Sequence, residues 1–328
     1  MMKIWSMATS LALVAGLGLA LAGCGKVNEV RAMKAFKDGN KQYQGSHWKE
    51  AAEKYEEVIQ LDPDNSIDTC WNEQGSSPGC VYFYLANSYD QMYRPTRKGE
   101  PQNDKYLEKA IENYKVAAEK IKDPKMKTLS LQYLVATYGP DKLNDPTQAE
   151  PVVKNMINID PRDPTNYFAL AKIYEDSGEY ELAEQTFLKA KEAKPNDPAV
   201  YLQLAGYYNR QGNFEKTIES LNERIKVEPN NPEAYYTLST YYWDEAYRDF
   251  KLNEKQKMEY VLSGIQAVNK AVEIKPDYME AIAYKNLLLR LQANLEKDPA
   301  KQQALLREAD QLRDKATELR KQRAAGVS

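Results

Sequence analysis

Few residues of this 328-residue chain have the type and spacing that chemistry requires. His47 is the only histidine, so a histidine triad would have one available base and a metal site at most one imidazole ligand. We interpret it as a turn residue. Glu56 and Glu57 stand in an amphipathic segment and are typical of a solvated helix face. The chain has no phosphate-binding glycine motif. We therefore expect no enzymatic activity, no metal and no small-molecule substrate.

Composition narrows the class of partner. The chain carries 45 basic and 48 acidic residues, a formal net charge of -3, and so lacks the strong basic field that nucleic-acid binding needs. Charged residues make up 28%, and there are 24 tyrosines but only 6 phenylalanines. This balance favours short helices, each with one buried stripe and wide polar faces. We expect no nucleic-acid partner.

The N-terminal residues are not expected to belong to the repeat fold. Lys3 is followed by an apolar run, residues 11–21, that is short for a membrane span and ends in small residues, as export signals do. The sequence Leu21-Ala22-Gly23-Cys24 resembles the lipobox of bacterial lipoproteins. This resemblance implies that residues 1–23 are a signal peptide, that Cys24 receives acyl chains, and that 24–30 is a lipidated tether. An ordinary signal peptide with an incidental cysteine is the alternative.

The residue after the cysteine bears on location. In the sorting rule known for lipoproteins of enterobacteria, aspartate at this place retains the protein at the inner membrane, whereas here the residue is Gly25. The resemblance therefore favours the outer membrane, facing the periplasm. Several acyl chains on one residue make a stable anchor. The lipid on Cys24 is the only bound group that we expect.

Two further cysteines, Cys70 and Cys80, flank an irregular stretch rich in Ser, Gly, Asn and Pro. An exported protein permits disulfides, so a Cys70–Cys80 bridge that staples this stretch to the next helix is the favoured interpretation. Two free thiols are the main alternative. A redox pair is disfavoured because the spacing is wider than in dithiol catalysts.

A repeat organises the rest of the chain. Pro161, Pro195 and Pro229 are separated by 34 residues each. Between them, large residues three and four apart alternate with small ones, a pattern that predicts helices packing closely in pairs. The unit from 164 to 197 resembles the tetratricopeptide repeat (TPR), with matches at Tyr167, Leu170, Ala171, Tyr174, Ala183, Phe187 and Pro195.

The resemblance implies an all-α, right-handed superhelical TPR solenoid of about six to seven helical hairpins with a C-terminal capping helix. One hairpin cannot bury its stripe alone, so the units must stack. We place the solenoid at 31–323 and a tail at 324–328, with units near 32–65, 79–124, 127–163, 164–197, 198–231, 232–278 and 279–323. The second unit carries about twelve extra residues from Arg94 to Lys105, which we expect to protrude as a loop because they contain Pro95, Gly99 and Pro101.

In TPR proteins the first helices of the hairpins line a concave surface. The resemblance therefore implies a peptide-binding groove lined by side chains of the first helices: Phe36, Asn40, Phe83, Asn87, Phe168, Lys172, Leu202, Arg210, Tyr236 and Trp243. Aromatic faces supply contact area at a low entropic cost, and asparagine pairs with a peptide backbone through both its donor and its acceptor. The alternative is that the aromatic residues only pack between neighbouring first helices.

The expected function is that of a membrane-anchored scaffold for other envelope proteins or peptides. By resemblance, such lipoproteins assist the assembly of pili, secretion channels, outer-membrane proteins or polysaccharide exporters. The alternative is an accessory regulator of a cell-wall hydrolase or synthase. Fold alone does not choose between them.

Overall fold

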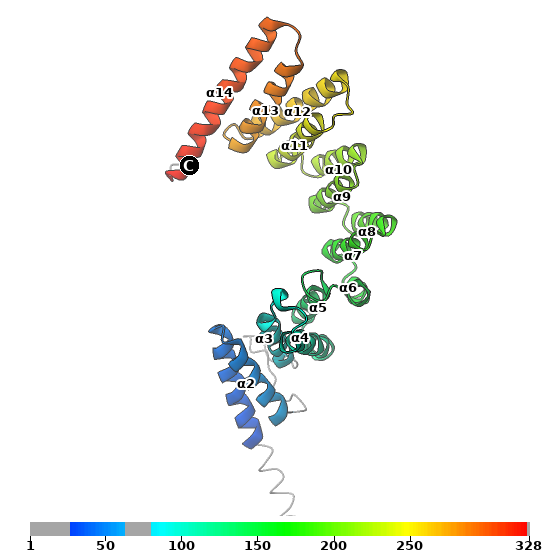
Figure 1. Ribbon diagram of the computed structural model, residues 1–328, viewed down its shortest axis with the longest axis vertical. Coiled ribbons are helices and arrows are strands. Elements are labelled where there is room, and N and C mark those ends of the chain that lie inside the picture. Colours follow the sequence, from blue (N-terminus) through cyan, green and yellow to red (C-terminus); the bar gives the residue numbers. More distant parts are fainter. Residues whose placement is uncertain (1–26, 63–79, 327–328) are drawn as a thin grey trace, which may run out of the picture. The chain divides into compact units, whose positions relative to one another are not determined.

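The computed structural model describes residues 27–62 and 80–326, and they form helices joined by short turns (Figure 1). No strand occurs in these ranges. Clustering of contacts divides the chain into an N-terminal unit, which ends at Pro161, and a C-terminal unit, which begins at Arg162. The predicted signal peptide, the predicted lipidation site Cys24 and the residue Cys70 lie outside the described residues.

The N-terminal unit contains three helical pairs. Its first helix covers residues 27–44 in the described range. The other helices are α2 (Trp48–Leu61), α3 (Cys80–Met92), α4 (Pro101–Lys120), α5 (Pro124–Tyr138) and α6 (Pro146–Ile159), with the 3₁₀ helix η1 (Pro95–Arg97) before α4. His47 lies in the turn before α2, as the sequence predicts, with its ring Nδ1 2.9 Å from Gln42 Oε1.

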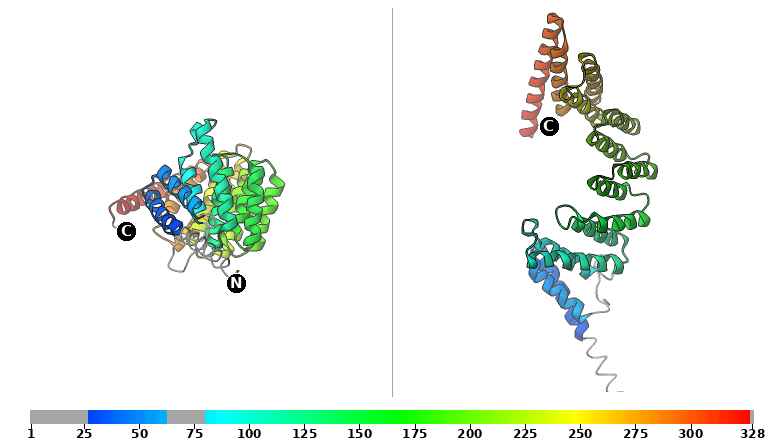
Figure 2. Two further views of the ribbon diagram at one scale, coloured as in Figure 1. Left: turned by 90° about the horizontal axis from the view of Figure 1, so that it is seen from below. Right: turned by 45° about the vertical axis from the view of Figure 1, so that its right-hand side comes forward.

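The C-terminal unit contains four pairs, and the last two helices run antiparallel (Figure 2). Its helices are α7 (Pro164–Asp176), α8 (Tyr180–Ala193), α9 (Pro198–Arg210), α10 (Phe214–Val227), α11 (Pro232–Arg248), α12 (Glu254–Ile274), α13 (Met279–Leu295) and α14 (Pro299–Ala324). Seven pairs therefore lie within the described ranges, in agreement with the predicted hairpins.

Local sequence explains where these helices begin and end. Asp163, Asp197 and Asn231 stand 34 residues apart, and each side chain accepts a hydrogen bond from a backbone N–H in the first turn of α7, α9 or α11. Each is followed by a proline at the first helical position, where no N–H is needed. Gly178 and Gly212 adopt positive φ angles of 77° and 69° in the turns that follow, a conformation that suits glycine.

The predicted loop from Arg94 to Lys105 is wrong in extent. Helix α4 begins at Pro101, and η1 covers Pro95–Arg97 of the segment before it. Asn103 holds this connection, because its side chain accepts from Arg94 N (2.8 Å) and donates to the carbonyls of Arg94 and Arg97. Lys98 Nζ donates to the carbonyl of Lys142 at 2.9 Å, so the connection packs on the turn between α5 and α6.

Candidate functional site

All ten residues of the predicted groove lie on first helices, but the two units place them differently. Phe36 and Asn40 lie on the helix 27–44, and Phe83 and Asn87 lie on α3. The others lie on first helices of the C-terminal unit: Phe168 and Lys172 on α7, Leu202 and Arg210 on α9, Tyr236 and Trp243 on α11. Each unit is therefore considered separately.

In the N-terminal unit the aromatic residues of the row are core. Phe36 and Phe83 each expose 5% of their surface. The ring of Phe83 lies 5.6 Å from that of Tyr133 and 5.9 Å from that of Tyr114, in tilted and edge-on contacts that favour aromatic pairs. These two phenylalanines therefore pack between neighbouring helices, as the alternative interpretation of the row proposes.

The side chains of the two asparagines in this unit are also engaged in hydrogen bonds with tyrosines. Asn87 is buried, accepts a hydrogen bond from Tyr43 OH at 2.7 Å and donates one to Tyr114 OH at 3.1 Å. Asn40 accepts one from Tyr55 OH at 2.9 Å. Burial raises the pKa of Tyr43 to about 12, so its hydroxyl keeps the proton that it donates to Asn87. These amides connect tyrosines of the core.

In the C-terminal unit the same row is partly open. Phe168, Leu202 and Tyr236 are each half-buried, whereas the fully buried contacts between hairpins come from residues such as Phe187 and Leu221. Lys172 is exposed and forms an ion pair with Asp176 on its own helix. We call the set Phe168, Leu202, Tyr236 and Trp243 the first-helix face of the C-terminal unit.

Arg210 connects two first helices on this face. Its guanidinium donates to both carboxylate oxygens of Glu175, from Nε at 2.7 Å and from Nη2 at 2.9 Å, and so joins α9 to α7. Glycine at 206 leaves room for it, since a Cβ there would lie 3.3 Å from Arg210 Nη1. Arg210 is therefore engaged with its own chain, although it remains half-exposed.

Sequence reasoning found Tyr236 and Trp243 but missed two neighbours. Tyr247 is one turn beyond Trp243 on α11, and their rings stack at 4.9 Å with an interplanar angle of 9°. Tyr284 of α13 lies 5.3 Å from the ring of Tyr236 and 5.9 Å from that of Trp243. We call these four residues the aromatic stripe. The helical spacing of 236, 243 and 247 was the signal that could have found Tyr247.

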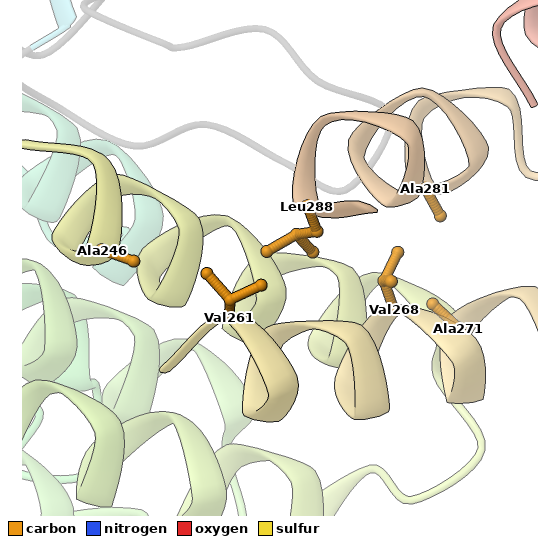
Figure 3. Packing of buried hydrophobic residues seen from close by; sticks show 6 residues of the cluster. All are labelled: Ala246, Val261, Val268, Ala271, Ala281 and Leu288. Atoms are coloured by element: carbon orange, nitrogen blue, oxygen red, sulfur yellow. The ribbon is translucent and has the colours of Figure 1, made fainter. Parts of the chain in front are cut away.

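A dense core holds the helices that carry this stripe. Side chains from α11, α12 and α13 meet there, and Figure 3 shows Val261 and Val268 pointing towards Leu288. The buried members are Ala246, Val261, Val268, Ala271, Ala281 and Leu288. Gly264 permits the close approach, because a Cβ there would lie 2.9 Å from Leu288 Cδ2 and 3.2 Å from Tyr242 Cβ. The stripe is thus built on a rigid base.

One polar arrangement occurs in both units. In the N-terminal unit, Lys109 Nζ lies 2.8 Å from Glu56 Oε1 and 2.7 Å from Tyr89 OH. Burial would raise the pKa of Glu56, but the hydrogen bonds from Lys109 and Tyr89 outweigh it and lower that pKa. The lysine lies over the tyrosine ring, 4.5 Å from its centroid. We call this the Glu56 clamp; it joins α2 to α3 and α4.

The C-terminal unit repeats the arrangement as the Glu184 clamp. Lys216 Nζ lies 2.6 Å from Glu184 Oε1, and Tyr208 OH donates to the same oxygen at 2.8 Å. The hydrogen bond from Lys216 lowers the pKa of Glu184, against the effect of burial. Lys216 also lies 5.0 Å from the centroid of the Tyr208 ring. Both clamps join one hairpin to the next, so we assign them a structural role.

Of the three cysteines, only Cys80 lies within the described residues. Cys80, the first residue of α3, is buried and disulfide-bonded. Because Cys70 lies outside the described ranges, the Cys70–Cys80 pairing stays a prediction. Across residues 27–62 and 80–326, no helix combines the length and hydropathy needed to cross a bilayer. The same ranges contain no cluster of three His, Cys, Asp or Glu side chains suited to a metal ion.

Comparisons with known proteins agree on the fold. A tetratricopeptide repeat family model matches residues 142–205. The C-terminal part of a TPR repeat-containing protein from Cytophaga hutchinsonii is similar over 87% of this chain and 98% of its own, with a TM-score of 0.54 and 15% identity. No curated protein matches the sequence.

Two other solved structures give lower TM-scores. A crystal structure of MamA gives a TM-score of 0.39 and 21% identity over 56% of this chain and 92% of its own. YrrB, a TPR protein with an unusual peptide-binding site, gives 0.38 and 14% over 64% and 99%. The family match and the likeness to the Cytophaga protein establish TPR-type helical hairpins, so the predicted all-α TPR fold is confirmed. Such arrays are scaffolds for protein–protein interaction.

Proposed function

We propose that this protein is a lipid-anchored adaptor of the bacterial cell envelope that holds a partner polypeptide on the first-helix face of its C-terminal unit. One observation carries the proposal. Phe168, Leu202 and Tyr236 are half-buried there, whereas Phe36 and Phe83 at the equivalent positions of the N-terminal unit are core. Partly exposed aromatic side chains on a rigid base are the typical anchors of a protein interface.

The anchor is the second part of the proposal. The sequence Leu21-Ala22-Gly23-Cys24 supports cleavage before Cys24 and acylation of that residue, with Gly25 favouring the outer membrane. The adaptor would then be tethered by residues 24–30 and would meet envelope proteins or peptides in the periplasm. Assembly of an envelope complex is the role that suits a tethered scaffold.

Crosslinking in living cells tests the binding face. A photo-reactive residue at Leu202 is expected to capture a discrete partner, identified by mass spectrometry, that the same residue at Leu188 does not capture. Leu188 is the matched control because it is an exposed leucine on the second helix α8. Equal capture from both positions, or none from Leu202, would rule out the proposed face.

A paired substitution tests the same face. Phe168→Ala with Tyr236→Ala is expected to abolish capture from Leu202 while the circular dichroism of the helices is unchanged. Phe83 is not a suitable third site, because it is core and its loss would destabilise the fold. Retained capture by the double variant contradicts the proposal.

The anchor has its own experiment. Cys24→Ser is expected to abolish labelling by radioactive palmitate and to move the protein from the membrane fraction to the soluble one. Cys80→Ser is a control for general effects of losing a cysteine and should retain the label. A labelled Cys24→Ser variant would overturn the lipid anchor without affecting the binding face.

A further inference from the structure

The aromatic stripe extends beyond what a TPR hairpin needs. Helix α11 has 17 residues, whereas the first helices α7 and α9 have 13 each. The added turn carries Tyr247, which is 63% exposed, and Phe250 follows the helix end with 86% of its surface exposed. Exposed aromatic side chains of this size on a soluble surface indicate an interaction site.

The polar tips of the stripe are unused. In the described part of the chain, the indole N–H of Trp243 donates no hydrogen bond to another protein group. The hydroxyls of Tyr236, Tyr247 and Tyr284 neither donate nor accept one. None of these atoms is buried without a partner, so each keeps some exposure to solvent. The stripe therefore offers ring faces together with several donors, and tryptophan is a donor only.

Several charged side chains of the first helices form ion pairs within the chain, with partners on first helices or, for Arg290, on α14. Arg210 is paired with Glu175, Arg248 with Asp244 at 2.8 Å, and Arg290 with Asp310 at 2.6 Å. Asp249 and Lys251, which flank Phe250, have opposite charges. With Glu245 counted, residues 244–251 carry three carboxylates and two cations, a net charge of -1, so a strongly charged ligand would find little to complement here.

We propose that the aromatic stripe binds an uncharged, proline-rich segment in the polyproline II conformation. Proline has a carbonyl acceptor and no N–H, so such a segment needs donors from the site, which Trp243 and the tyrosines supply. Its apolar rings pack on aromatic faces, and its stiff helix loses little entropy on binding. This inference rests on the proposed function and specifies the chemistry of the partner.

Calorimetric titration of the purified protein with a blocked oligoproline peptide tests the proposal. Saturable binding is expected, while a glycine-serine peptide and an oligolysine peptide of the same length should not bind. Absence of saturable oligoproline binding overturns the inference. Binding of oligolysine with equal affinity does so too, because it would indicate cation–π recognition instead.

Conservative variants show whether the stripe is the site. Trp243→Phe and Tyr247→Phe keep the rings but remove the donors, so each should weaken oligoproline binding about fivefold, the worth of one hydrogen bond. Tyr180→Phe is the matched control, because Tyr180 is 50% exposed but lies on the second helix α8. Unchanged affinity in Trp243→Phe and Tyr247→Phe, or an equal loss in Tyr180→Phe, overturns the assignment.

The crosslinking experiment separates the two proposals. If Leu202 captures a partner in cells but oligoproline does not bind, the adaptor function stands and the proline-rich ligand is wrong. If oligoproline binds through the stripe but Leu202 captures nothing, the ligand chemistry stands and the adaptor function fails.

Discussion

The N-terminal and C-terminal units use the same repeat position in opposite ways. In the first, Phe36 and Phe83 lie among tyrosines from adjacent helices and are core. In the second, Phe168 and Tyr236 are half-buried on the helix surface. A row of aromatic residues along first helices is therefore not a binding surface in itself. What decides is whether the packing of neighbouring helices covers the ring, as it does for Phe36 and Phe83 and does not for Phe168 and Tyr236.

The difference also separates two kinds of polar residue. Asn87 connects Tyr43 and Tyr114 inside the N-terminal unit, so its amide forms hydrogen bonds that stabilise the fold. In the C-terminal unit, Lys172 and Arg210 pair with carboxylates near the surface. Substitutions at matched positions should thus affect stability in the first unit and binding in the second.

The largest expected effect on the free energy of unfolding comes from alanine substitution at Phe83, compared with the same substitution at Phe168. Phe83→Ala should lower the free energy of unfolding by about 3–5 kcal/mol, because it removes a buried ring and leaves a cavity. Phe168→Ala should cost about 1–2 kcal/mol, because part of its ring is already in contact with water. Urea denaturation with hydrogen exchange on peptides of each unit measures both. Equal losses would remove the contrast between the units.

Asn87→Ala should give the next largest loss. It leaves the hydroxyls of Tyr43 and Tyr114 without their partner, at a cost of about 1–3 kcal/mol. Adding Tyr114→Phe removes one stranded hydroxyl, so the double variant should lose less than the sum of the single variants. Lys172→Ala, at an exposed ion pair, should change the free energy of unfolding by less than about 0.5 kcal/mol. A small effect of Asn87→Ala would contradict its assignment to the core.

The sequence was sufficient for the fold because its signals are local. Proline spacing, the caps Asp163, Asp197 and Asn231, and the small residues Ala183 and Ala190 specify helix ends and close packing within each hairpin. These features recur at a fixed period, so one well-matched unit predicts its neighbours.

The exposure of site residues could not be predicted in the same way. Whether Phe83 is covered depends on Tyr133, which is distant along the chain, and Asn87 is held by Tyr43, 44 residues away. The structure of residues inserted between the helices of a repeat could not be predicted either. Those after Arg94 partly extend helix α4, and the lengthened α11 adds Tyr247 to a surface rather than to a loop. Such outcomes depend on tertiary packing, which periodicity does not encode.

Three glycines inside helices extend the comparison of the two units to substitutions with smaller expected effects on stability. A Cβ at Gly39 would lie 2.8 Å from Tyr55 Cε1, and one at Gly264 would lie 2.9 Å from Leu288 Cδ2, both on fully buried side chains. Alanine at either position should cost about 1–2 kcal/mol, since overpacking exceeds the gain in helix propensity. A Cβ at Gly206 would meet only Arg210 Nη1, at 3.3 Å, which is not one of the two nitrogens bonded to Glu175. Gly206→Ala should therefore be neutral or slightly stabilising. Equal destabilisation by all three would contradict close packing as the reason for glycine at positions 39 and 264.

The smallest effect concerns acid stability, and it should be alike in both units. The folded-state pKa values of Glu56 and Glu184 lie below their ordinary value, so the unfolded chain binds protons first as the pH falls. The stabilisation that each clamp supplies is therefore complete above the ordinary pKa of glutamate and is lost as the pH falls through the folded-state value. Since both carboxylates are partly exposed, each clamp should contribute less than about 1 kcal/mol.

Glutamine variants test this expectation. Glu56→Gln and Glu184→Gln should each lower the free energy of unfolding near neutral pH, and the difference from the parent protein should shrink on acidification. Glu181→Gln, at an exposed carboxylate on the same helix as Glu184, controls for the general effect of replacing a glutamate by glutamine. A penalty that persists unchanged in acid would mean that glutamine disturbs packing and that the clamp is not electrostatic. If only one of the two variants responds to pH, the clamps are not equivalent, and the units differ in how their hairpins are joined as well as in what their first helices expose.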